Sequence, residues 1–102
     1  MNIVLDLLFE SNDELLEEVL DFKEYFSAIN PIEYDDIDLL AENIILRLEM
    51  VCRKMNCLFD MVSIAYAFCL IEDETIDSYK ALATDIHKFA SEIVDKVNEM
   101  VE

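Results

Sequence analysis

The sequence is poor in the residues that form turns between β-strands. Its 102 residues include no glycine, no tryptophan and a single proline. Tight hairpin turns depend on glycine, asparagine–glycine pairs or proline, so a chain without glycine is poor material for a β-sheet. The composition therefore predicts an all-α protein, and the length predicts a single helical domain over residues 1–102.

Basic residues are scarce. Seven Lys and Arg stand against 24 Asp and Glu, which gives a formal net charge of -17. Direct binding to nucleic acid is not expected, because contacts to phosphates need lysine and arginine. Three interpretations of the acidity remain open: it keeps an apolar chain in solution, it complements a basic protein partner, or it includes carboxylates that hold Mg²⁺.

Long hydrophobic runs are also missing. The longest, residues 61–71, contains one serine and is too short to span a bilayer, so no membrane insertion is expected. Residues 2–9 include an aspartate with no basic residue before them, which is not the pattern of a signal peptide. Three cysteines (Cys52, Cys57 and Cys69) fall at apolar positions, so we expect small core side chains and a reducing compartment, the cytoplasm.

Apolar residues between Asp35 and Leu70 recur at alternating steps of four and three residues, an unbroken heptad seam. The seam consists of Ile37, Ala41, Ile44, Leu48, Val51, Met55, Leu58, Val62, Ala65 and Cys69. A second file of apolar residues beside it makes the stripe wider than a two-stranded coiled coil needs. We therefore expect one long helix that is packed against two or more neighbours.

The same spacing predicts a helix on either side of the central one. Ser11 and Glu14 fit a capping box that starts the first helix, and Asn30-Pro31 ends it. Asp35 or Asp36 can cap the central helix, and Asp73 or Thr75 can cap the last one, which runs to about residue 101. Residues 1–9 are expected to form a short separate N-terminal helical segment.

The predicted fold is a small helical bundle of three main helices of about 18, 35 and 27 residues. A short first helix beside two long ones leaves part of the central seam uncovered. Hydrophobic residues also make up 55% of the chain, more than a small monomer easily hides. We therefore expect a homo-oligomer or a complex with another protein.

One acidic constellation could carry chemistry. Glu14, Glu17, Glu18 and Asp21 share one helical face, and Glu42 lies on the next helix. Carboxylates from two neighbouring helices can hold Mg²⁺ in a bundle. The alternative is an ordinary solvated face of a strongly acidic protein.

The segment LLEEVLDF, residues 15–22, resembles the first metal motif of MazG-like all-α nucleoside triphosphate pyrophosphohydrolases. The family's second motif, Glu-x-x-Asp, would align with residues 39–42, where Leu39 replaces one acid and Glu42 replaces the aspartate. The resemblance covers roughly residues 13–66. It implies Mg²⁺ ligands at Glu17, Glu18, Asp21 and Glu42, and a turn near Asn56.

Three functions follow as hypotheses. The first is a small acidic interaction protein of the antitoxin, immunity-protein or phage-inhibitor type, which binds and neutralises a basic protein and in one version presents carboxylates in place of nucleic-acid phosphates. The second is a Mg²⁺-dependent MazG-like hydrolase, active or degenerate. The third is a structural subunit of a helical assembly. An unbroken helix at Asn56 favours the first hypothesis, and a turn there favours the second.

Overall fold

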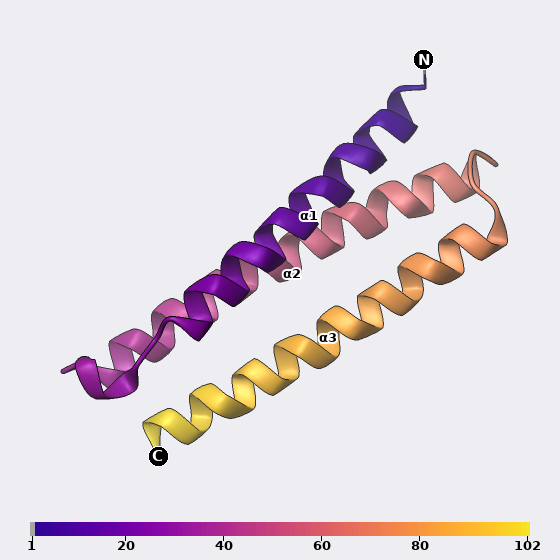
Figure 1. The fold of residues 1–102 in the computed structure, drawn as a ribbon. Helices are drawn as coiled ribbons and strands as arrows, with labels where there is room; N and C mark the ends of the chain where they lie inside the picture. The colour runs from indigo at the N-terminus through magenta and orange to yellow at the C-terminus, as the bar shows by residue number, and fades with distance from the viewer. Residues whose placement is uncertain (1) are drawn as a thin grey trace.

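The computed structural model describes residues 2–102 and consists of three long helices, each antiparallel to the next along the chain (Figure 1). They are α1 (Ile3–Ser27), α2 (Ile37–Ala67) and α3 (Asp73–Val101), with one 3-10 turn at Pro31–Glu33. The molecule is elongated, with extents of 52 × 22 × 16 Å. The predicted all-α fold with three main helices is confirmed. None of the helices in residues 2–102 combines the length and apolar character needed to cross a membrane.

The central helix α2 supplies most of the core. It packs against both α1 and α3, which touch each other through the rings of Phe22 and Phe89, with centroids 5.7 Å apart. Eight of the ten residues in the predicted seam are buried, and Val51, Leu58 and Val62 are fully inaccessible. Each fully buried aliphatic side chain stabilises the fold by roughly 1.5–3 kcal/mol. The seam therefore holds the three helices together, as its spacing predicts.

The first helix is longer than the sequence predicts. It starts at Ile3 and runs without a break through Ser11, so the prediction of a separate N-terminal segment is wrong. Leu8 and Leu15 lie seven residues apart on the buried face, and both are almost fully inaccessible. This shared burial keeps the helix intact past the capping-box residues. Asn2 is the actual N-cap, and its side chain accepts hydrogen bonds from the backbone N–H groups of Val4 and Leu5.

The second helix is continuous. It passes through Asn56 as regular α-helix, so the turn implied by the MazG-like resemblance is not formed. Asp36 caps its start, as predicted, by accepting a hydrogen bond of 3.0 Å from the Leu39 N–H. Glu72, not Asp73 or Thr75, is the N-cap residue of α3, and it makes no side-chain capping bond.

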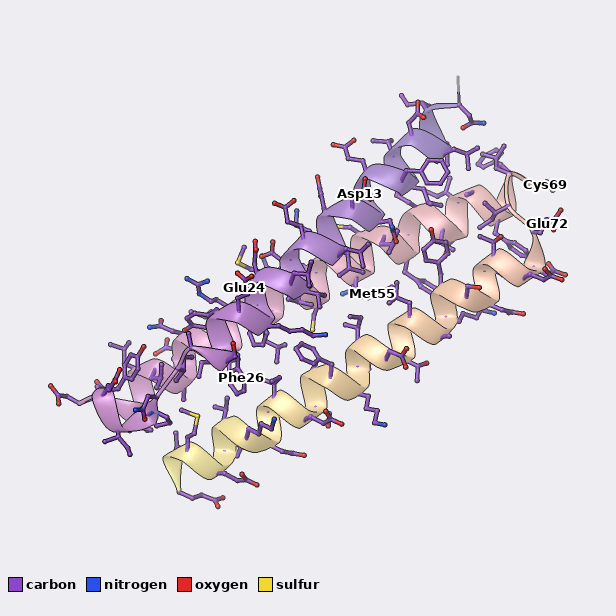
Figure 2. All side chains as sticks on the ribbon, viewed as in Figure 1. Asp13, Glu24, Phe26, Met55, Cys69 and Glu72 are labelled. Atoms are coloured by element: carbon purple, nitrogen blue, oxygen red, sulfur yellow. The ribbon has the colours of Figure 1, made fainter. Side chains whose placement is uncertain are left out.

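The C-terminal end of α2 forms a Schellman motif, the paired hydrogen bonds that close many helices. The Leu70 N–H donates to the Ala65 carbonyl at 2.8 Å, and the Cys69 N–H donates to the Tyr66 carbonyl at 3.0 Å. Cys69 adopts the left-handed conformation with φ of 58°. Figure 2 shows Cys69 and Glu72 at the connection between α2 and α3. The expectation that the cysteines are core residues is wrong for Cys57 and Cys69, which are both exposed, while Cys52 is half-buried.

The three helices are nearly equal in length, with 25, 31 and 29 residues. The prediction that a short α1 leaves the end of the central seam uncovered is therefore wrong, because the N-terminal segment is part of α1. Large apolar side chains are nevertheless exposed on all three helices; Leu20 is 62% exposed and Phe68 71%. The expected oligomer stays a prediction.

Candidate functional site

The side of α1 that faces away from the core is acidic along its whole length. We define the acidic face as Asp6, Glu10, Asp13, Glu17, Asp21 and Glu24, all of them exposed. Their steps of four, three, four, four and three residues place them on the side of α1 opposite Leu8 and Leu15. Figure 2 shows oxygen-bearing side chains along the edge of α1 that faces away from α3. The acidic face thus runs from Asp6 to Glu24, about 27 Å along the helix.

Two more carboxylates, Glu14 and Glu18, flank the acidic face where α1 meets α2. Glu14 accepts a hydrogen bond of 3.1 Å from the Lys54 Nζ, one of two ion pairs within residues 2–102. This hydrogen bond raises the pKa of Lys54. Glu18 and Asp21 line an open hollow of about 340 Å³ with Met50 of α2. α1 therefore carries eight carboxylates and a single basic residue, Lys23.

The other cationic side chains of α2 are already engaged. Arg47 stacks over the ring of Tyr25, with its guanidinium carbon 4.0 Å from the ring centroid. Arg53 pairs with Glu49 of its own helix at 2.7 Å. These contacts leave most of the carboxylates of α1 without a neutralising partner in the described part of the chain.

The predicted metal ligands lie on two helices, as expected, but at different positions along the helix axes. Glu17, Asp21 and Glu42 are exposed, and Glu18 is half-buried. The Glu14–Lys54 pair gives the register of the two helices, because it places residue 14 of α1 opposite residue 54 of α2. Glu42 lies 12 residues before Lys54, or about 18 Å along α2, whereas Glu17 and Glu18 lie only about 5–6 Å along α1 from Glu14. Glu42 is therefore about 12 Å from their level, beyond the reach of one cation.

Residues 2–102 contain no group of three or more His, Cys, Asp and Glu side chains that could hold a metal ion. Glu17, Glu18 and Asp21 share one side of α1, but Glu42 does not join them. Heptad position predicts which face of a helix a residue occupies. It does not give the position of that residue along the axis of a neighbouring helix, so the sequence alone does not reveal the distance between Glu42 and the other three carboxylates.

Two other reactive side chains, His87 and Cys52, lie on α3 and α2. His87 is exposed and lines a hollow of about 330 Å³ between α2 and α3 with Asn56 and Asp60. Burial, followed by the charge of Glu49, raises the pKa of the Cys52 thiol. A raised pKa keeps this thiol protonated at neutral pH, which is the opposite of what a nucleophile needs.

Sequence reasoning identified only part of the acidic face. Asp6 belongs to residues 1–9, which the sequence predicts to be a separate segment, and Glu10, Asp13 and Glu24 are outside the predicted ligand set. The signal that identifies them is their own spacing of three and four residues, which continues across Ser11.

No protein-family model, no curated protein and no solved structure matches this chain. The MazG-like resemblance therefore stays a prediction from residues 15–22 and 39–42. Among the described residues, the acidic face is therefore the candidate functional surface.

Proposed function

We propose that this chain is a small interaction protein that uses the acidic face of α1 to bind and neutralise a basic protein. The observation that carries the proposal is the one-sided charge of α1, with eight carboxylates against one lysine. Six of these carboxylates point away from the core on a rigid helix. A continuous negative surface of this kind speeds the encounter with a basic partner and excludes acidic ones.

The spacing of the charges supports a partner that normally binds nucleic acid. The six carboxylates of the acidic face, spread over about 27 Å of helix, give one negative charge every ~5 Å. The phosphates of one DNA strand follow each other at ~3.4 Å along the helix axis. A lysine- or arginine-lined cleft that accepts such a strand can accept α1 in its place. An antitoxin, immunity protein or phage inhibitor that presents carboxylates in place of phosphates would act in this way.

The proposal is tested by neutralising the acidic face and capturing partners from the native host. The test variant replaces its six carboxylates with amides: Asp6→Asn, Glu10→Gln, Asp13→Asn, Glu17→Gln, Asp21→Asn and Glu24→Gln. The control variant removes six exposed carboxylates of α3 in the same way, at Glu74, Asp77, Asp85, Glu92, Asp95 and Glu99. Both variants lose the same total charge, so only the location differs.

We expect the wild type and the α3 variant to retain a basic protein that the α1 variant loses. Duplex DNA should displace this protein, and its affinity should fall steeply as salt rises. Equal capture by the two variants, or an affinity indifferent to salt, would contradict the proposal. The three free cysteines suit a reducing compartment such as the cytoplasm, where we place this interaction.

A structural subunit of a helical assembly is the second candidate. The exposed large apolar side chains favour it, among them Leu20, Ile32 and Phe68. Size-exclusion chromatography with light scattering separates the candidates. A homo-oligomer at micromolar concentration supports the assembly, and a well-folded monomer supports the interaction protein.

A further inference from the structure

The helix α2 carries a second apolar row that neither α1 nor α3 covers. We name it the outer row: Leu39, Leu46, Met50, Cys57, Ile64 and Phe68. All six side chains are exposed; Leu46 is 53% and Phe68 71% accessible. The steps between them are seven, four, seven, seven and four residues, which keeps them in line along about 43 Å of helix.

The outer row lies on the flank of α2 that is turned away from α3. The hollow between α2 and α3 is lined on α2 by Asn56, Phe59 and Asp60, none of which belongs to the outer row. Met50 of the outer row instead lies beside Glu18 and Asp21 of α1. Around the axis of α2, the contact with α1 therefore lies between the contact with α3 and the outer row.

Acidic residues border the outer row on both sides. On the α1 side stand Glu14, Glu18 and Asp21. On the other side, Glu42, Glu49 and Asp60 follow the row along the back of α2. Of the nearest cations, Arg53 and Lys54 each pair with a glutamate of these borders, and Arg47, beside Met50, stacks on Tyr25. Arg53 lies in line with the outer row between Met50 and Cys57, so the surface is an apolar strip, interrupted by one paired arginine, between two rims of net negative charge.

We infer that the outer row docks an amphipathic helix of the partner, with apolar residues along one face and lysine or arginine on both flanks of that face. The apolar side chains would fill the strip, and the basic flanks would meet the two acidic rims, which is the helix-in-groove mode of recognition. A second copy of this chain suits the strip poorly, because each copy carries a net charge of -17. The inference rests on the proposed function and names the element of the partner that is recognised.

The test uses the full chain and a synthetic 21-residue helical peptide with leucine at heptad positions a and d and lysine at e and g. A scrambled peptide of equal composition keeps the charge and loses the periodicity. We expect the heptad peptide to bind at least about tenfold tighter than the scrambled one, because only it can bury an apolar stripe. The double variant Leu46→Gln/Ile64→Gln should lower its affinity about tenfold or more. Leu16→Gln/Leu20→Gln on α1, at positions that are also exposed and lie outside the row, should leave the affinity unchanged.

Thiol alkylation gives an independent readout in the unmodified protein. Cys57 lies in the middle of the outer row and Cys69 lies beyond its end, and both are exposed. The bound heptad peptide should slow alkylation of Cys57 about tenfold or more and leave Cys69 reactive, because only Cys57 lies under the docked helix. Both double variants should show the helical circular dichroism of the wild type, since they alter side chains that are already exposed.

Three outcomes overturn the inference. The peptides bind equally well, or the two double variants bind the heptad peptide alike, or Cys57 is protected by self-association of the chain without peptide. Failure of this inference is separate from failure of the proposed function. Loss of the host protein on neutralising the acidic face supports that function even if the outer row binds no helix.

Discussion

Replacing Cys69 with glycine should stabilise the protein. Cys69 holds a left-handed conformation with φ of 58° at the end of α2, where glycine is the usual residue. The left-handed conformation costs a residue with a β-carbon roughly 1–2 kcal/mol. Glycine avoids this cost but loses about 0.4–1 kcal/mol through the greater freedom of the unfolded chain. Because the Cys69 side chain is exposed, little packing is lost, and the net gain is about 1 kcal/mol.

Thermal unfolding followed by circular dichroism measures the gain. For a chain of this length, 1 kcal/mol corresponds to a rise in Tm of roughly 5 °C. Cys69→Ala controls for loss of the thiol and should leave Tm nearly unchanged, since alanine pays the same conformational cost. Cys57→Gly is the matched control in the middle of α2, where glycine should destabilise by about 0.3–0.5 kcal/mol relative to cysteine.

The same substitution at two exposed cysteines is therefore expected to shift Tm in opposite directions. A fall in Tm for Cys69→Gly comparable to that for Cys57→Gly would refute the reasoning. It would mean that position 69 continues the right-handed helix and that the Schellman hydrogen bonds are not formed.

Four further predictions concern the core, pH, salt and magnesium. Leu8→Ala should lower the free energy of unfolding by about 2–5 kcal/mol, because Leu8 is buried. Leu7→Ala, at the exposed neighbouring position, should lower it by less than ~1 kcal/mol. Equal small losses would mean that the start of α1 is not packed. The Tyr66 hydroxyl donates a 2.6 Å hydrogen bond to Asp73, and this bond raises the Tyr66 pKa above its ordinary value near 10. Its stabilisation is complete below pH 10 and is lost as the pH rises through the higher folded-state value, so the Tm difference from Tyr66→Phe should vanish in that range. Raising NaCl from 0.05 to about 0.5 M should raise Tm, because screening of the -17 net charge outweighs the weakening of two solvent-exposed ion pairs; a falling Tm would contradict this. Mg²⁺ should raise Tm no more than NaCl of equal ionic strength, and a magnesium-specific rise with release of pyrophosphate from a nucleoside triphosphate would favour the MazG-like alternative.

The sequence predicts the core of this fold well because burial depends on periodicity. A step of three or four residues returns to the same face of a helix, so the seam of α2 can be identified without any knowledge of its neighbours. Val51, Leu58 and Val62, in the middle of the seam, are fully buried. The ends of the seam are less regular, since Ile37 is only half-buried and Cys69 lies beyond the last turn.

The helix boundaries are predicted less well because capping competes with packing. A capping bond contributes roughly 1 kcal/mol, whereas one buried leucine contributes roughly 1.5–3 kcal/mol. At Ser11 the packing of Leu8 prevails, and the helix continues through a favourable capping sequence. At Asp36 no buried residue lies upstream in the connecting segment, and the cap marks the actual start of α2.

The uncovered apolar surface is one flank of α2, not one of its ends. The sequence indicates more apolar surface than the neighbouring helices cover, but unequal helix lengths are the wrong reason, because α1 and α3 nearly match α2. Two helices can cover only two flanks of a third. The outer row, with Leu46 and Phe68 exposed, occupies a third flank that no helix within residues 2–102 covers. Since both borders of that flank are acidic, a basic helix would complement it better than a second copy of this chain with its net charge of -17.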